Sequence, residues 1–243
     1  MRGSILATGL LLLGACSMGE ASEGEGKSSG QKGSRDFQVG AFDKVALSGS
    51  PNVIVTVGGA PSVRAEGDTG LLEKLEISVV NGTLRIGYKK GNWSFGWRKD
   101  HGPVTVRVSV PSLTGAEVAG SGDMKIDKVE GGDFAGEIAG SGEIELASLS
   151  ARNASFSIAG SGGVTAAGTA ETADFSIAGS GDVRAAGLEV KRAKVSIAGS
   201  GNVEAKATET ADISIMGSGD AVITGTAKCN VSKMGSGDAR CGG

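Results

Sequence analysis

Apolar and polar side chains alternate through the second half of the chain, and the alternation itself repeats about every twenty residues. The tripeptide Gly-Ser-Gly begins at Gly120 and then recurs six times, in steps of 20, 20, 19, 20, 18 and 18 residues. The position two residues before its first glycine is occupied in turn by Val118, Ile138, Ile158, Ile177, Ile197, Ile215 and Lys233. A period of two predicts a strand with one face turned inward in every repeat.

The same alternation resumes after each Gly-Ser-Gly. One apolar column there contains Met124, Ile144, Val164, Val183, Val203, Ala221 and Ala239. Each repeat therefore predicts two short strands joined at the tripeptide, where glycine permits a positive φ or the close stacking of identical backbones. A fixed period of this length is typical of stacked repeats. We predict an all-β fold, a β-solenoid with coils of about 20 residues that lie about 4.8 Å apart.

The region 37–110 is less regular but also rich in predicted strands. Asn81-Gly82 separates two alternating segments, 76–80 and 83–86, and predicts a hairpin. Leu71 to Leu75 is interpreted as a short helical turn. Leu47-Ser48-Gly49-Ser50 is interpreted as a degraded copy of the repeat motif, which indicates that this region begins the same stack.

The first residues have the pattern of an export signal. Arg2 precedes an apolar run from Ile5 to Leu13, which is too short to span a bilayer. The run ends in Leu13-Gly14-Ala15-Cys16, which resembles the lipobox of bacterial lipoproteins and implies acylation of Cys16. An ordinary signal peptide that contains a cysteine is the alternative. Ser17 follows where inner-membrane retention signals usually have Asp, so the resemblance implies sorting to the outer membrane in a two-membrane bacterium.

Composition narrows the classes of function. Gly accounts for 43 of 243 residues, the net charge is −3, and His101 is the single histidine. The charge disfavours a nucleic-acid partner bound through a basic field. One histidine excludes most Ser-His-Asp and multi-histidine metal chemistry. We therefore predict a protein that is not an enzyme and needs no cofactor.

A set of motifs outside the repeat carries a family resemblance. It comprises Ala41-Phe42-Asp43-Lys44-Val45, the hairpin Asn81-Gly82-Thr83-Leu84 and Val110-Pro111-Ser112-Leu113, together with the Gly-Ser-Gly-Asp repeats. From about Phe37 onward the chain resembles the auto-transporter adhesin head GIN domain family. The resemblance implies a right-handed parallel β-helix in a secreted or lipid-anchored protein. It implies no activity and no catalytic residues.

These observations divide the chain into three parts. Residues 1–15 are predicted to form a lipoprotein signal peptide, and residues 16–36 a flexible tether rich in Gly, Ser, Glu and Lys. Residues 37–243 form the predicted β-solenoid domain, irregular over 37–110 and regular over 111–243.

The residue after each Gly-Ser-Gly forms a mostly acidic column. Its carboxylates are candidate calcium ligands, because Ca²⁺ prefers oxygen donors: Asp123, Glu143, Asp182, Asp220 and Asp238. Gly163 and Asn202 interrupt the column. The favoured interpretation is that these side chains bond the backbone of their own turns.

Cys229 and Cys241 lie six residues before and after Gly235, at positions that face inward in earlier repeats. Because an exported protein folds in an oxidising compartment, we predict a disulfide between them, which stabilises a loop of this size by about 3 kcal/mol. Reactive thiol chemistry is the alternative. Neither a Cys-X-X-Cys motif nor a histidine partner supports it.

The segment from Tyr88 to His101 concentrates aromatic and cationic side chains. A ligand-binding loop is predicted there, with Tyr88, Trp93, Phe95, Trp97 and Arg98 as its candidate residues. Such a loop is suited to glycan rings, peptidoglycan or a membrane surface. The favoured alternative is that the rings fold over one open end of the solenoid as a hydrophobic lid.

Taken together, the sequence predicts a non-enzymatic, lipid-anchored protein of the cell envelope, on the periplasmic or surface face of the outer membrane, with a binding or structural role. The predicted partners are the membrane, through the anchor, and a glycan, peptidoglycan or another envelope protein. A homo-oligomer is compatible with the flat faces of a solenoid. The alternatives are a polysaccharide-modifying β-helix enzyme and an accessory subunit of an envelope complex.

Overall fold

The computed structural model describes residues 31–89 and 102–242, and this part of the chain is almost entirely β-structure. Its one helix is α1 (Thr69–Lys74). The strands before the regular repeats are β1 (Lys32–Phe37), β2 (Lys44–Gly49), β3 (Asn52–Val57), β4 (Ser62–Asp68), β5 (Leu75–Val80), β6 (Thr83–Tyr88) and β7 (Thr105–Val110). Those of the repeats are β8 (Gly115–Gly120), β9 (Met124–Ile126), β10 (Val129–Glu130), β11 (Asp133–Gly140), β12 (Glu143–Gly160), β13 (Gly163–Gly179), β14 (Asp182–Gly199), β15 (Asn202–Gly217), β16 (Ala221–Thr224), β17 (Lys228–Gly235) and β18 (Ala239–Cys241).

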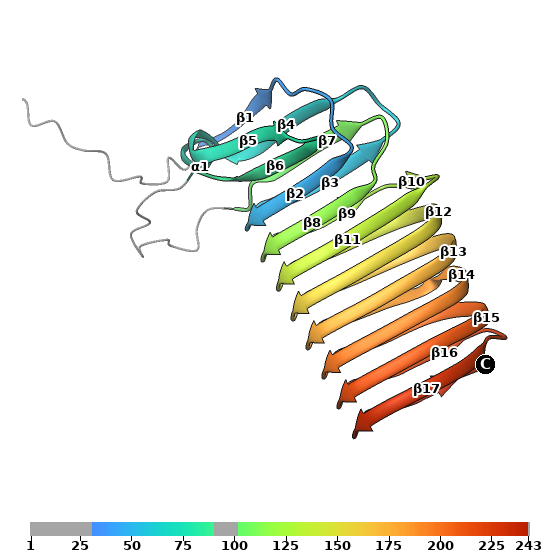
Figure 1. The fold of residues 1–243 in the computed structure, drawn as a ribbon. Helices are drawn as coiled ribbons and strands as arrows, with labels where there is room; N and C mark the ends of the chain where they lie inside the picture. The colour runs from blue at the N-terminus through green and yellow to red at the C-terminus, as the bar shows by residue number, and fades with distance from the viewer. Residues whose placement is uncertain (1–30, 90–101, 243) are drawn as a thin grey trace, which may run out of the picture.

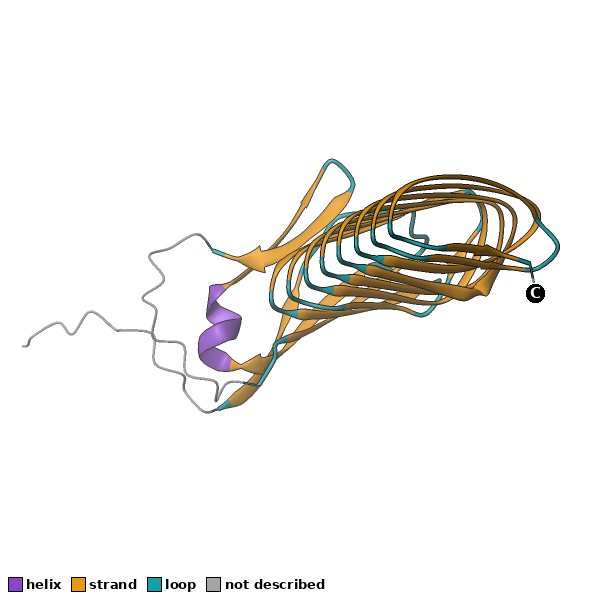
Figure 2. Cartoon of the chain, turned by 90° about the horizontal axis from the view of Figure 1, so that it is seen from below, coloured by secondary structure: helices purple, strands orange, loops and turns teal. Residues whose placement is uncertain are grey.

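The repeats stack as a parallel β-solenoid, which confirms the predicted fold. Each strand pairs in parallel with the equivalent strand of the next repeat; β12 and β13 pair with Phe156 opposite Phe175 and Gly160 opposite Gly179. Figure 1 shows one arm of each coil, β8, β11, β12, β13, β14, β15 and β17, stacked side by side down one axis. Seen from below, the superimposed coils enclose a flattened interior (Figure 2).

The stack begins in the irregular region, as the degraded motif predicted. β2 pairs in parallel with β8, and Gly49 lies opposite Gly120, the first glycine of the first regular Gly-Ser-Gly. On the far side of the turn, β3 pairs in parallel with β9. The first coil therefore uses the same register as the later ones.

The predicted hairpin and helical turn are also confirmed. β5 and β6 pair antiparallel, and the two residues of their turn, Asn81 and Gly82, have φ values of 51° and 76°. Positive φ at both positions is what a two-residue hairpin turn requires. α1 is capped by the side chain of Asp68, whose Oδ1 accepts the backbone N–H of Gly70 at 2.9 Å.

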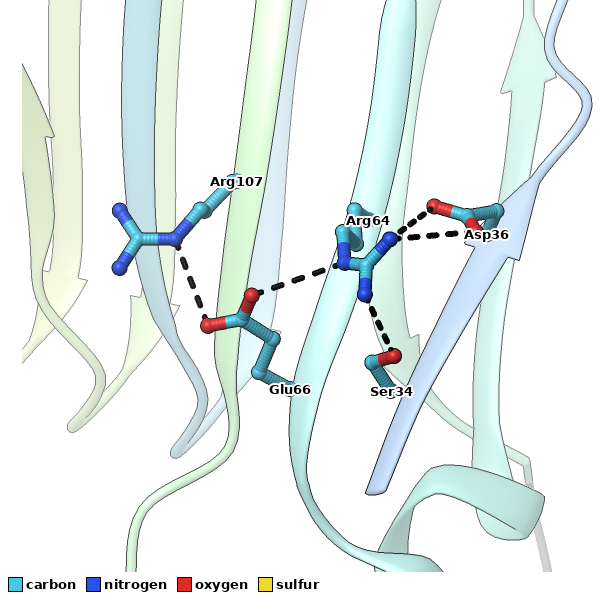
Figure 3. Close-up of polar contacts among 5 residues, drawn as sticks. All are labelled: Ser34, Asp36, Arg64, Glu66 and Arg107. Atoms are coloured by element: carbon cyan, nitrogen blue, oxygen red, sulfur yellow. Dashed lines mark hydrogen bonds and ion pairs between the residues drawn. The ribbon is translucent and has the colours of Figure 1, made fainter. Parts of the chain in front are cut away.

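The boundary of the predicted tether needs correction. Residues 32–36 were assigned to a flexible segment, but they belong to β1, which pairs antiparallel with β4 over its whole length. Polar contacts hold this strand: the guanidinium of Arg64 on β4 donates to Ser34 Oγ at 2.7 Å and lies 3.4 Å from Asp36 Oδ2 (Figure 3). The folded domain therefore starts at least as early as Lys32.

The core is built from the inward columns. The side chains two residues before each Gly-Ser-Gly are buried from Val118 to Ile215. Four residues before it, the rings of Phe156 and Phe175 stack at 5.8 Å between centroids with an interplanar angle of 9°. In the last described coil the same column is open, and Val231 is 43% exposed.

Candidate functional site

The acidic column lies along one corner of the solenoid and forms a hydrogen-bonded ladder between coils. In each rung the backbone N–H of one coil donates to the side-chain oxygen at the same position of the coil before it. Four such hydrogen bonds join Glu143 to Asp123 at 3.1 Å, Asn202 to Asp182 at 3.2 Å, Asp220 to Asn202 at 3.2 Å and Asp238 to Asp220 at 2.8 Å. The ladder thus links neighbouring turns, whereas the sequence favoured bonds within each turn.

Sequence reasoning missed the first member of this ladder. Asn52 Oδ1 accepts the backbone N–H of Asp123 at 3.4 Å, so the column starts in the irregular region. The signal was present in Ser50-Pro51-Asn52, where Asn follows the degraded tripeptide as Asp follows the regular one.

The calcium hypothesis for this column gains no support. Within residues 31–89 and 102–242, no three His, Cys, Asp or Glu side chains converge to hold a metal ion. Asp123, Asp182 and Asp220 already accept hydrogen bonds from the next coil. Beside the first carboxylates of the column, the hydrogen bond to Glu145 raises the pKa of Lys125, whose ammonium lies 2.6 Å from Glu145 Oε2.

The gap in the ladder at Gly163 yields a stability prediction. A Cβ at Gly163 would have only ordinary contacts, the nearest being Glu143 Oε1 at 3.5 Å. In Gly163→Asn, the new side-chain oxygen is expected to share the backbone N–H of Asp182 with the carbonyl of Gly162, which accepts it at 3.1 Å, just as the N–H of Asn202 is shared between Gly181 O and Asp182 Oδ1. We expect a gain of about 1 kcal/mol in the free energy of unfolding, from one hydrogen bond and a less flexible unfolded chain.

Urea unfolding measures this gain, and Gly163→Ala is the matched control. Gly163→Ala lowers the backbone entropy of the unfolded chain as Gly163→Asn does, but its side chain cannot accept the hydrogen bond from Asp182. Equal stability of Gly163→Asn and Gly163→Ala would contradict a role for the ladder in joining coils.

The predicted disulfide is present. Cys229 on β17 and Cys241 on β18 are bonded to each other, 12 residues apart in sequence. Their partners in the preceding coil are Ala211 and Ile223, both buried, so the cysteines do occupy the inward columns. The bridge joins the two arms of the last described coil.

Of the candidate aromatic loop, the structure describes only Tyr88. Trp93, Phe95, Trp97 and Arg98 lie outside the described residues, so the binding-loop and lid interpretations both remain predictions. Tyr88 ends β6, and its ring lies close to Gly49 of the first coil. Burial raises the pKa of the Tyr88 phenol, while a side-chain hydrogen bond with Ser50 acts in the opposite direction.

A pH titration tests this environment directly, because Tyr88 is the single tyrosine of the chain. We expect the ultraviolet absorbance of its phenolate to appear with a midpoint above the ordinary value of about 10. Since the folded pKa is raised, the associated stability is present below the unfolded pKa and is lost as the pH rises through the folded value. Unfolding in denaturant should return the midpoint to the ordinary value, and Ser50→Ala should raise it further. A midpoint at or below the unfolded one would contradict the burial.

A groove of about 1000 Å³ runs down the outside of the stack, across β2, β8 and β11 to β15. It follows the positions around the buried alanines Ala154, Ala173, Ala193 and Ala211, at the start of the strand segment that leads to each Gly-Ser-Gly. Their small side chains let the backbone approach the core. The outer surface is hollowed along this column.

Two rows of outward side chains form most of the walls of this groove. One row, seven residues before each tripeptide, consists of Asp133, Asn153, Thr172, Arg192 and Thr210. The other, five residues before it, consists of Ala135, Ser155, Asp174, Lys194 and Asp212. In the first two regular coils, Glu117 and Glu137 also line the groove. These residues could not be identified from the sequence, because they form a site only once the coils are stacked.

The chain matches a known protein family over most of its length. Residues 41–227 match the family described as "Putative auto-transporter adhesin, head GIN domain". The chain belongs to this family. The match covers the irregular first part together with the repeats as far as β16, so the GIN domain includes both.

Solved structures share the same fold. A protein described as a putative adhesin from Bacteroides fragilis is 23% identical, with a TM-score of 0.79, over 88% of this chain and 98% of that one. A protein described as a putative lipid binding protein from Parabacteroides distasonis is 25% identical, with a TM-score of 0.70 and the same coverage. A putative adhesin from Parabacteroides merdae is 19% identical, with a TM-score of 0.68, over 88% and 97%. No curated protein matches the chain.

No described helix is long and apolar enough to cross a membrane. The family description indicates a protein of the cell surface or envelope.

Proposed function

We propose that this GIN-domain protein is a non-enzymatic binding protein of the cell envelope, held at the outer membrane by a lipid on Cys16. The observation that carries the binding role is the repetition of the solenoid surface. The same outward positions recur in coil after coil, from β8 to β15, whereas a catalytic site would require one coil to depart from the pattern.

The charges on this surface support a binding role over catalysis. Most ion pairs of the described coils, such as Lys125–Glu145 and Lys206–Glu189, are exposed and link neighbouring coils. Enzymes that cleave glycans generally use two carboxyl groups held about 5–9 Å apart around the scissile bond. Each of these glutamates is instead paired with a lysine of a neighbouring coil. An accessory subunit of an envelope complex is the second candidate, and it requires a protein partner to occupy the open groove.

The anchor rests on the lipobox-like Leu13-Gly14-Ala15-Cys16. The chain from there to Lys32 is a polar stretch that is suited to a tether. Several acyl chains on one cysteine hold a protein firmly at a membrane, whereas a single chain binds only reversibly.

Metabolic labelling with a palmitate analogue tests the anchor, and protease treatment of intact cells tests the location. We expect the wild-type protein to carry the label and Cys16→Ala to lack it. An unlabelled wild-type protein would contradict the lipid anchor. If the protease cleaves the protein on intact cells while a periplasmic control protein stays uncleaved, adhesion at the cell surface is supported. If the protein is fully protected, its partner is to be sought in peptidoglycan or among envelope proteins.

A further inference from the structure

We propose that the groove along the stack binds a linear, uncharged, hydroxyl-rich glycan whose chain runs parallel to the solenoid axis. The proposal gives a ligand class and a place to the binding role proposed above and rests on it. It is carried by the direction of the groove, by the chemistry of its two walls and by the bonding of its floor.

The direction of the groove fits a polymer that repeats at the spacing of the coils. The walls present one pair of side-chain positions per coil, and neighbouring coils are separated by the distance between adjacent strands, about 4.8 Å. A pyranose unit in an extended glycan has a similar length, so successive sugars can meet equivalent positions of successive coils. An extended peptide advances about 3.3 Å per residue and falls out of step with the coils.

The walls offer alternating donors and acceptors rather than a field of one sign. In the first wall, Asn153 Nδ2 donates to Asp133 Oδ1 at 2.8 Å, and Thr172 Oγ1 donates to Asn153 Oδ1 at 2.6 Å. In the second, Lys194 Nζ lies 3.6 Å from Asp174 Oδ2. Sugar hydroxyls both donate and accept, so they can bond either kind of group along such a wall.

The charge of the lining disfavours anionic polymers. It contains five acidic and three basic side chains. Nucleic acids and acidic glycans need a cationic surface to replace their counterions, and this groove does not provide one. An uncharged chain pays no such electrostatic cost.

The floor disfavours a protein partner. The backbone of the alanine column already pairs with the coils on both sides: Ala173 is in register with Ala154 and with Ala193. No strand can therefore be added there through main-chain hydrogen bonds. The lining also lacks exposed aromatic or large apolar anchors, which dominate protein interfaces, because its one aromatic residue, Phe134, is buried.

Isothermal titration of the purified full-length protein against neutral linear oligosaccharides of increasing length tests the proposal. The oligosaccharides are β-linked glucose, mannose and xylose series, with oligogalacturonate as the charged comparison. We expect affinity to rise with chain length in at least one neutral series and to be weaker for the galacturonate of equal length.

Two variants with the same new side chain locate the site. Ser155 and Ser150 are both exposed on β12, but only Ser155 lines the groove; the partners of Ser150 in the neighbouring coils, Glu130 and Thr169, also lie outside the lining. Ser155→Trp should block the groove and weaken binding at least about tenfold, whereas Ser150→Trp should bind like the wild type. Thermal melting of both variants shows whether each is folded, and Asn153→Ala repeats the test by removing a wall amide without adding bulk.

Several outcomes would overturn the proposal. They are no binding of any neutral series, preference for oligogalacturonate, or equal losses in folded Ser155→Trp and Ser150→Trp. Because one structural relative is described as lipid binding, phosphatidylcholine and phosphatidylglycerol vesicles form a further arm. Vesicle binding that Ser155→Trp removes would also overturn it. Failure of the palmitate label with intact glycan binding would instead contradict only the anchor, so the two proposals fail separately.

Discussion

Replacing Gly160 with alanine is expected to destabilise the solenoid by about 3 kcal/mol or more. Gly160 has a φ of 131°, in a region that L-residues rarely adopt. A Cβ there would also collide with the carbonyl oxygen of Gly140 in the preceding coil. That carbonyl is fixed, because it accepts the backbone N–H groups of Ser161 at 2.9 Å and Gly162 at 3.0 Å. The coil cannot move away without breaking the turn's hydrogen bonds.

Two control substitutions separate the backbone strain from the collision between coils. The stability of each variant is measured by urea unfolding. Gly49 has a φ of 101°, but a Cβ there would have ordinary contacts at 3.7 Å, so Gly49→Ala should cost only the backbone strain, about 1–2 kcal/mol. Ser161 is exposed between the two glycines, and Ser161→Ala should change stability by less than about 0.5 kcal/mol. If Gly160→Ala were no less stable than Gly49→Ala, close stacking of the coils would not be the reason for the tripeptide.

The parts of the fold that depend on repetition could be predicted from the sequence. The period of Gly-Ser-Gly determines the register, since each first glycine lies opposite the next one, as Gly179 lies opposite Gly199. Cys229 and Cys241 could be paired because the same period places both in inward columns of one coil. Asn81-Gly82 determined its hairpin through local turn chemistry alone.

Features that depend on contacts outside the period could not be predicted. β1 contains the sequence Lys-Gly-Ser-Arg-Asp-Phe, which has the composition of a tether, and its partner β4 lies more than twenty residues further along an irregular region. Arg64, which reaches both Ser34 and Asp36, gives no signal in sequence that it does so. The groove is similar: each wall residue is unremarkable in its own repeat, and the hollow exists only across the stacked alanines.

Truncating Phe156 to alanine is expected to cost about 3–5 kcal/mol, the usual loss for a buried phenylalanine. Its side chain is 1% exposed, stacks on Phe175 and lies 6.0 Å from Phe134 between ring centroids. A matched pair in the same column tests whether burial is the cause. Val195 is fully buried and Val231 is 43% exposed. In urea unfolding, Val195→Ala should therefore lose clearly more stability than Val231→Ala, and equal losses would contradict a column that is closed by its neighbours.

Gly136 occupies this column one coil before Phe156 and makes room for the ring. A Cβ at Gly136 would lie 2.9 Å from Cδ1 of Phe156, closer than real side chains approach. Gly136→Ala should therefore destabilise the wild type but be neutral or stabilising when Phe156 is already alanine, because the added methyl then fills part of the cavity. The expected coupling in this double-mutant cycle is about 1–3 kcal/mol. If the two losses of stability were additive, Gly136 would be needed for its backbone conformation rather than for the space that it leaves for the Phe156 ring.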